Sequence, residues 1–389
     1  MKILWISHLT VILLIYSIIC WGESTVNEHK AVQTYFDSQI NDEDIPGVQY
    51  LVVDANQTIY QYMGGWADIA LQKPMKANIT MMAYSQTKTI TAAAILKLYQ
   101  TGKLDLEANV NSYLLKLPYK KPMTIRQLLA QTSGLPDPIP LRWAHVVNEH
   151  QEFDEETALV RVLEDNPELS FEPGEKYQYS NISYWLLGKV IEKVSGENYE
   201  DYVRQHIFEP LNINKMELDY TIQNPKQHAK GYLAKYSFLN LIKGFLLDKK
   251  LIGETSRYEK NWLHINNHYL NGPAFGGLVG TAAGFSKFLQ DQLKPNSLIL
   301  NEKVKTLFYQ QQTNSAGELI EMTLGWHIGH TGDEQYYFKE GGGGGFHSEM
   351  RIYPKQGIAS VIMVNKTNFK SKKVLNHVDQ YFLSSNNVK

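Results

Sequence analysis

Cysteine is nearly absent from this sequence. The 389 residues include a single cysteine, Cys20, which lies in an N-terminal segment that we expect to be removed on export. A mature chain without thiols has no disulfide scaffold, no cysteine nucleophile and no metal site built on cysteine. A chain of this length can bury a large hydrophobic core, so its stability does not depend on disulfides.

Neither sign of charge is in excess. Lys and Arg number 38 against 40 Asp and Glu, the formal net charge is -2, and 43% of the residues are hydrophobic. These proportions are those of a globular protein, and they exclude a disordered tail, a collagen and a multi-span membrane protein. Binding to nucleic acid needs a basic face that displaces counterions from phosphates, which this composition does not indicate. We therefore expect no nucleic-acid partner.

The N-terminus has the pattern of an export signal. Lys2 precedes an apolar run over residues 3–20, and polar residues follow Gly22. This order predicts a signal peptide over residues 1–22. The run is also close to the length of a membrane span, so an uncleaved anchor is the alternative, whereas a lipid on Cys20 is disfavoured by the bulky residue before it. We expect an exported protein, periplasmic or secreted, that meets a membrane only through a retained N-terminus.

Strand patterns occur near both ends of the chain. Residues 47–53 and 58–63 flank a four-residue polar turn and predict a hairpin that ends at Gly64-Gly65. Three further strands are predicted at 335–339, 348–353 and 357–364, where Gly-rich or Pro-containing turns separate β-branched and aromatic runs.

Helical patterns fill most of the remaining chain. Apolar residues recur at helical spacing over 85–101 and 184–194, and a glycine follows each segment. Two more helices are predicted at 30–40 and 370–383, close to the two ends.

The economical topology is one sheet built from both chain ends, with a helical lobe inserted between them. We predict a single domain over 23–389. Its α/β part comprises about 23–84 and 270–389, and its mostly helical lobe comprises about 85–269.

Ser85 and Lys88 open the predicted helix at 85–101. A spacing of three places the hydroxyl and the amine one turn apart on the same face, where a proton can pass between them. The helix N-terminus adds free N–H groups where an anionic oxygen would form. Alone the pair is weak evidence, since a capping serine followed by a solvated lysine has the same spacing.

Tyr179 and Asn181 follow a turn-rich segment and precede the helix at 184–194. Two residues apart, their side chains could point to the same side of the chain. Taken alone, a packing aromatic and a capping asparagine explain them better than catalysis does.

Lys339 ends a predicted strand, and five glycines follow at Gly341–Gly345. Glycines at a strand edge let a substrate lie against the backbone, whose N–H groups can then bind an oxyanion. A flexible hairpin loop is the alternative. A dinucleotide fingerprint is excluded, because the spacing is wrong and no helix follows.

Taken together and in this order, the three motifs resemble the serine β-lactamase and penicillin-binding-protein superfamily. Tyrosine in the second motif resembles its class C β-lactamase and esterase branch. Similar segments extend the resemblance over about 40–364: 124–137, 171–175, 184–188, 207–211, 276–283 and Gly325-Trp326. The resemblance implies a β-lactamase-like α/β (α+β) fold, with an antiparallel sheet flanked by helices and an inserted helical lobe.

The resemblance also implies a mechanism. Ser85 would be the acylated nucleophile, and either Lys88 or Tyr179 would take its proton. Lys339 would help to hold Tyr179 as a phenolate. Both candidate bases titrate near pH 10 when unperturbed, so which of them works as the base stays open.

The same resemblance implies the groups that bind substrate. Asn181 would hydrogen-bond Lys88 and the substrate carbonyl region, and the run that begins at Gly341 would form the substrate edge. The oxyanion hole would consist of the N–H groups of Ser85 and Gly342. The resemblance implies no metal or organic cofactor.

Three positions depart from the family pattern. Glu340 stands where Thr or Ser is frequent, and we expect its carboxylate to lie beside the site for a β-lactam carboxylate and to repel it. Gln131 replaces a common histidine, which should affect support of the site more than its chemistry. The run Gly341–Gly345 should be entropically loose. His327 and His330 show no metal-site pattern, and we expect them to be surface or core residues.

We therefore expect an exported serine hydrolase that cleaves small-molecule or peptide esters or amides, cell-wall fragments being one source. Esterase-like activity is slightly favoured over D-amino-acid peptidase or DD-carboxypeptidase activity, and β-lactam hydrolysis should be poor. The alternative is a catalytically silent protein that binds penicillin or peptidoglycan. Substrate choice would lie in loops such as 138–154 and 235–268.

Overall fold

The computed structural model describes residues 26–114, 117–138, 143–246, 249–252 and 258–384. The predicted signal peptide lies outside these residues. The first described element is a helix over 26–41, which confirms the helix predicted at 30–40. None of the described helices is long and apolar enough to cross a lipid bilayer.

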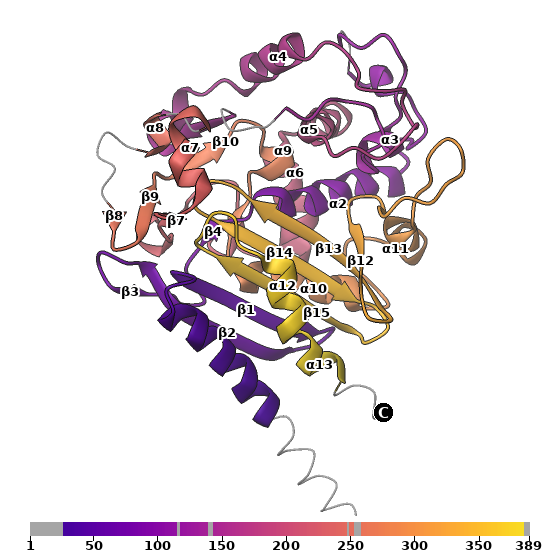
Figure 1. The fold of residues 1–389 in the computed structure, drawn as a ribbon. Helices are drawn as coiled ribbons and strands as arrows, with labels where there is room; N and C mark the ends of the chain where they lie inside the picture. The colour runs from indigo at the N-terminus through magenta and orange to yellow at the C-terminus, as the bar shows by residue number, and fades with distance from the viewer. Residues whose placement is uncertain (1–25, 115–116, 139–142, 247–248, 253–257, 385–389) are drawn as a thin grey trace, which may run out of the picture.

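A seven-stranded antiparallel sheet forms the centre of the fold (Figure 1). In spatial order its strands are β12 (His327–Thr331), β13 (Glu334–Gly342), β14 (His347–Tyr353), β15 (Ile358–Val364), β1 (Gly47–Asp54), β2 (Thr58–Asp68) and β3 (Lys73–Pro74). Strand β1 pairs with β15, so the sheet joins both ends of the chain, as predicted.

The predicted hairpin is formed by β1 and β2. The expectation that it ends at Gly64-Gly65 is wrong, because β2 continues to Asp68. Pairing with β1 persists as far as Gly65, and Trp66 then pairs with β3. The glycines therefore lie inside a paired strand rather than in a turn.

Helices cover both faces of the sheet. The helix at 26–41, α12 (Ser371–Val378) and α13 (Gln380–Ser384) pack on one face in a cluster that includes Phe36 and Leu375. Helix α10 (Ala282–Leu293) packs on the other face against β1 and β15. The helix predicted at 370–383 is interrupted at Asp379, whose buried carboxylate accepts hydrogen bonds from Tyr50 and Tyr353, each at 2.6 Å. This carboxylate ties the C-terminal helices to the sheet.

The chain between the two groups of sheet strands carries most of the described helices. Its helices are α2 (Thr87–Gln100), α3 (Ile125–Leu129), α4 (Glu155–Asp165), α5 (Asn181–Ser195), α6 (Tyr199–Val203), α7 (Phe238–Leu246), α8 (Lys249–Ile252), α9 (Pro273–Gly276), α10 and α11 (Glu302–Tyr309). Helices α2 and α5 confirm the two helices predicted from apolar spacing.

Three small antiparallel sheets accompany these helices. They are β4–β11–β6 (Met81–Met82, Val279–Gly280, Leu218–Asp219), β5–β10 (Ala144–Val146, His268–Leu270) and β7–β9–β8 (Gly231–Ala234, Trp262–Ile265, Tyr258–Glu259). The predicted fold class is confirmed, while the proposed boundaries near residues 84 and 270 stay a prediction.

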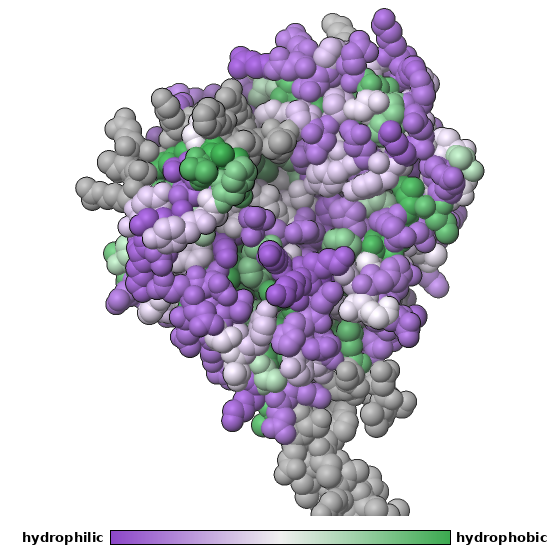
Figure 2. Space-filling view, in the orientation of Figure 1, coloured by the Kyte–Doolittle hydropathy of each residue, from purple (hydrophilic) through white to green (hydrophobic). Residues whose placement is uncertain are grey.

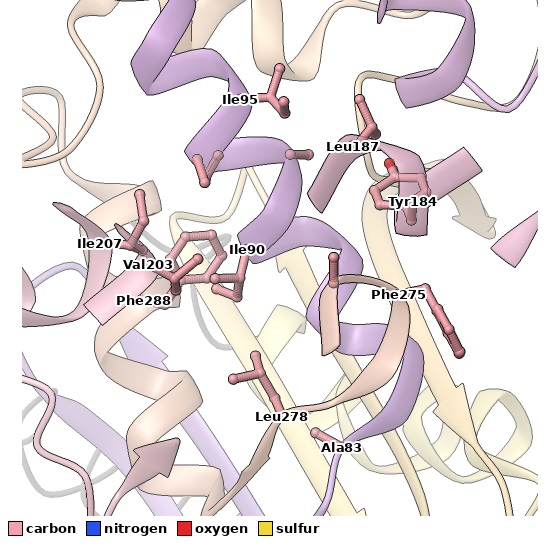
Figure 3. Close-up of a cluster of buried hydrophobic side chains, with 14 of the residues drawn as sticks. Ala83, Ile90, Ile95, Tyr184, Leu187, Val203, Ile207, Phe275, Leu278 and Phe288 are labelled. Atoms are coloured by element: carbon pink, nitrogen blue, oxygen red, sulfur yellow. The ribbon is translucent and has the colours of Figure 1, made fainter. Parts of the chain in front are cut away.

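Helix α2 is the centre of the larger hydrophobic core. Figure 3 shows Ile90 and Ile95 of this helix among side chains from its neighbours, including Tyr184 of α5 and Phe275 of α9. Eleven of the fourteen residues of α2 are buried. A helix that is buried nearly all round holds its N-terminus in a fixed place. That N-terminus carries Ser85 and Lys88.

Candidate active site

Ser85 lies in a short 3-10 turn, η1 (Tyr84–Gln86), directly before α2. Its Oγ is 3.1 Å from the Nζ of Lys88, which lies in the first turn of α2. The Tyr179 hydroxyl, which precedes α5, donates a hydrogen bond to the same Oγ at 2.6 Å. The structure thus brings the first two predicted motifs together around one hydroxyl.

The amine of Lys88 is completely buried. It donates hydrogen bonds to Oδ1 of Asn181 and to the carbonyl oxygen of Phe275, both at 2.7 Å. Burial, and secondarily the charge of Lys339, lower the pKa of Lys88 well below its usual value, although Asp137 opposes the shift. The uncharged amine is therefore favoured far more than in an exposed lysine.

Tyr179 is held between two amines. Nζ of Lys88 and Nζ of Lys339 lie 4.8 and 5.0 Å from the centre of its ring. Burial nevertheless raises the pKa of the Tyr179 hydroxyl far above its usual value. Burial therefore favours the neutral hydroxyl of Tyr179 in the free site, which goes against the expectation that Lys339 holds it as a phenolate.

Lys339 reaches the site from β13. Its side chain is fully buried, and its Nζ has no hydrogen-bond partner among the described residues. Burial lowers the pKa of Lys339 to about 7, a shift that the charge of Glu340 partly opposes. The structure therefore places a buried, unpaired amine, which changes charge near neutral pH, beside Tyr179.

Asp137 is a site residue that sequence reasoning missed. Its Oδ1 accepts hydrogen bonds from the backbone N–H of Asn181 at 3.2 Å and from Nδ2 of Asn181 at 3.1 Å. These bonds orient the amide so that its Oδ1 faces Lys88. Asp137 closes the family-like segment 124–137, but no spacing rule in the sequence relates it to Asn181.

Gln131 supports the same loop. Its Oε1 accepts a hydrogen bond from the N–H of Ser180 at 2.6 Å, and its Nε2 donates to the carbonyl of Ser180 at 3.3 Å. Ser180 lies between Tyr179 and Asn181, so Gln131 positions both. This geometry agrees with a supporting role rather than a chemical one.

The run Gly341–Gly345 is closely packed, so the expectation of a loose loop is wrong. A β-carbon at Gly341 would overlap the carbonyl oxygen of Ala83 and lie 2.9 Å from the nitrogen of Ser85. The N–H of Gly345 donates a hydrogen bond to Oγ1 of Thr367 at 2.7 Å. At Gly341 and Gly345 neighbouring backbone leaves no room for a side chain, and at Gly343 the ring of Tyr84 fills the space, whereas a β-carbon at Gly344 would make only ordinary contacts.

Gly342 has the right orientation for an oxyanion donor. It lies opposite His347 in the β13–β14 pair, and the next residue, Gly343, donates to the carbonyl of Phe346 at 3.1 Å. Hydrogen bonding alternates along antiparallel strands, so the Gly342 N–H points away from β14. Strand β12 covers that edge of β13 only as far as Phe338. The Gly342 N–H therefore faces an edge that β12 leaves open.

Glu340 points away from the site, contrary to expectation. Neighbouring residues of a strand face opposite sides, so Glu340 and Lys339 diverge. Oε1 of Glu340 lies 2.7 Å from Nε2 of His347 and accepts a hydrogen bond from Ser371 at 3.4 Å. The hydrogen bond from His347 lowers the pKa of Glu340. Its charge acts on Lys339 and Tyr179 only through space.

Tyr84, directly before Ser85, is a second residue that the sequence did not single out. Its φ of +49° is uncommon for a tyrosine. Its hydroxyl donates a hydrogen bond to the carbonyl of Gly344 at 2.7 Å and lies 3.1 Å from Nε2 of His268. Its ring packs against Gly343. Tyr84 therefore ties the turn that carries Ser85 to the glycine run.

His327 lies beside the site rather than apart from it. Its ring centre is 6.5 Å from that of Tyr179, and its Nε2 is 3.1 Å from the hydroxyl of Tyr177. Burial, then Lys339 and Lys88, lower its pKa well below the usual value, so it stays uncharged. Within the part of the chain that the structure describes, no cluster of three or more potential ligand side chains is placed to hold a metal ion.

Comparison with known proteins gives one family match and a distant relative. A family model described as Beta-lactamase matches residues 32–382. Protein flp of Staphylococcus aureus (strain MW2) is 27% identical over 370 residues, which cover 91% of this chain and 66% of that protein. The chain therefore spans just under two thirds of this relative's length.

Two solved structures resemble the fold closely. The octameric penicillin-binding protein homologue from Pyrococcus abyssi has a TM-score of 0.74 at 20% identity, covering 91% of this chain and 77% of that chain. The D-amino acid amidase from Ochrobactrum anthropi SV3 has a TM-score of 0.73 at 20% identity, covering 92% and 99%. At this identity the likeness concerns the fold.

We expect Tyr84→Phe to slow the reaction of Ser85 with a fluorophosphonate about tenfold, because the glycine run loses the hydrogen bond that fixes it against η1. Tyr184→Phe is the matched control. It removes another buried hydroxyl, which donates to the carbonyl of Leu129, away from the glycine run. Each variant should lose about 1 kcal/mol of stability. Equal labelling rates in both variants would contradict a positioning role for Tyr84.

We expect Lys339→Met to raise the free energy of unfolding at pH 7 by roughly 2–4 kcal/mol. The native pKa of Lys339 is about 7 and the unfolded value is near 10.5, so the unfolded chain binds more protons in this interval. The wild type should therefore gain stability as the pH rises through this window, and the variant should gain less, because only the contribution of Lys88 remains. Urea unfolding across the pH range measures both, with the exposed Lys355→Met as control. If the variant were less stable than the wild type at pH 7, the claim that the buried Lys339 amine lowers stability would be refuted.

Proposed function

This chain belongs to the beta-lactamase family, whose model matches residues 32–382, and we propose that it is an exported serine hydrolase that cleaves esters or amides through an acyl-enzyme on Ser85. The family and its fold place the chain among the serine β-lactamases and penicillin-binding proteins. The specific reaction and the export are our proposals.

The observation that carries the proposal is the set of partners around the Lys88 amine. An uncharged amine has two N–H donors and one lone pair. The donors face Asn181 and the Phe275 carbonyl, and the remaining partner is the hydroxyl of Ser85 at 3.1 Å. The lone pair is thus directed at the proton that must leave Ser85. This arrangement supports Lys88 as the base and the neutral Tyr179 as a hydrogen-bond donor.

The proposed reaction has two halves. Lys88 takes the proton of Ser85, whose Oγ attacks the substrate carbonyl carbon while the N–H groups of Ser85 and Gly342 hold the oxyanion. The bond to the leaving group breaks, and the leaving group takes a proton from the Lys88 ammonium and Tyr179 hydroxyl pair. Water then loses a proton to the same base and attacks the acyl carbon. The bond between that carbon and Oγ of Ser85 breaks, and Oγ takes the proton back from the base.

Esterase-like activity remains our first choice for the substrate class. The buried, unpaired amine of Lys339 favours a second candidate, a D-amino-acid peptidase, because a substrate carboxylate would supply its missing partner. The charge of Glu340 lowers the positive potential at the Lys339 amine and so weakens binding of a β-lactam carboxylate to that amine. This supports the proposal of poor β-lactam hydrolysis. The ranking is tested by kcat/KM on a p-nitrophenyl ester, a D-Ala-D-Ala peptide and a penicillin. Faster turnover of the peptide would reverse it.

We expect one fluorophosphonate adduct on the full chain and none on Ser85→Ala, as measured by intact mass. Ester turnover should fall at least about 10⁴-fold in Ser85→Ala and about as far in Lys88→Met, because nucleophile and base act as a unit. Tyr179→Phe should keep more activity than Lys88→Met if Lys88 is the base. An unlabelled wild-type chain would favour the silent binding protein instead.

A further inference from the structure

Helix α7 exposes large apolar side chains on its outer side. Phe238 and Leu241 are one turn apart and are 72% and 79% exposed, and Tyr236, just before the helix, is 83% exposed. In Figure 2 a green patch lies where Figure 1 places α7, in a surface that is otherwise largely purple. A surface helix normally exposes polar residues, whereas the exposed side of α7 carries apolar ones. Contiguous exposed apolar surface marks an interaction site.

Other residues of α7 pack against the protein, so the exposed residues are not the side of the helix that belongs in the core. Leu239 packs on the cluster of Leu233, Leu263 and Ile265 beneath the helix. Asn240 is buried and donates hydrogen bonds to the carbonyl of Lys235 and to the hydroxyl of Tyr258. The inner contacts fix the rotation of the helix, and this rotation leaves Phe238 and Leu241 in water.

The charged residues of the segment that carries these apolar side chains are of one sign. The segment 235–246 contains two lysines and no acidic residue. Lys235 and Lys243 lie on either side of Phe238 and Leu241 in sequence, and neither forms a salt bridge with a residue that the structure describes. Lys235 is exposed beside the Tyr236 ring. Aromatic and aliphatic side chains framed by lysines suit the boundary between lipid headgroups and acyl chains of an anionic bilayer.

We propose that the surface formed by Lys235, Tyr236, Phe238, Leu241 and Lys243 docks on an anionic lipid bilayer. The helix lies in the plane of the interface, where the apolar side chains enter the acyl boundary and the lysines meet lipid phosphates. Nine residues form an interfacial helix and are too few to span a bilayer.

This surface is separate from the N-terminal region. In Figure 1 the helix at 26–41 lies at the lower end of the molecule, whereas α7 lies at the upper left. Docking through α7 is therefore a contact distinct from any anchor formed by the chain's first residues. An apolar cavity of about 420 Å³ between α7 and the glycine run, lined by Leu233, Leu239 and Gly343 among others, lies next to the docking surface.

The test places an environment-sensitive fluorophore on the surface of the full chain. In a Cys20→Ser background, Phe238→Cys and Leu241→Cys carry the label, and Leu71→Cys and Leu319→Cys serve as controls, being exposed leucines elsewhere. With vesicles of phosphatidylcholine and phosphatidylserine, labels at 238 and 241 should brighten and shift to shorter wavelength, while the control labels should not. The comparison is within one chain, so binding through the N-terminus does not mimic the result.

Charge dependence is tested in the same labelled chain. Adding Lys235→Glu and Lys243→Glu should weaken the vesicle affinity reported at position 241 at least about tenfold. Labels at 238 and 241 that stay unchanged on every vesicle would overturn the proposal. So would a shift without vesicles that grows with protein concentration, because it would assign the surface to a second copy of the chain. Thermal unfolding of each labelled protein shows that the fold is intact.

Discussion

The buried amine of Lys88 is the constraint on which the candidate site depends. An ammonium ion in this position would lose its hydration, so burial favours the uncharged form. The amine keeps its two N–H groups satisfied by Asn181 and the Phe275 carbonyl, and only the Ser85 hydroxyl is left for its lone pair. In the proposed reaction, burial therefore keeps Lys88 in the form that can accept a proton, and its fixed partners direct the lone pair to Ser85.

The rest of the fold holds these partners in place. Helix α2 is buried nearly all round and carries Lys88, while α5 and α9, which bring Asn181 and Phe275, pack directly against it. Strand β13 adds Lys339, whose charge further disfavours a charged Lys88. Lys339 is a second buried amine, and unlike Lys88 it is unpaired, so it lowers stability, which is a common cost of active sites.

Local spacing and family resemblance predicted much of this arrangement. Ser85 and Lys88 lie one helical turn apart, so their contact follows from sequence alone, whereas the meeting with Tyr179 and Lys339 was implied only by the resemblance. The direction of Glu340, the packing of the glycine run, and the parts played by Asp137 and Tyr84 were not predicted. Each depends on contacts between segments far apart in the chain. The neutral state of Tyr179 depends on the balance of burial and charge around its hydroxyl, which cannot be derived from the amino-acid sequence.

The central claim is that Lys88 is largely uncharged in the free site at a pH where exposed lysines are charged. An NMR titration of the full chain with ¹³Cε-labelled lysine measures this directly, the Lys88 signal being assigned by its absence from Lys88→Met. The account predicts that the pKa of Lys88 lies well below that of the exposed lysines. It also predicts that this pKa rises in Lys339→Met, where a neighbouring charge is removed. A Lys88 signal that titrates with the exposed lysines would contradict the account.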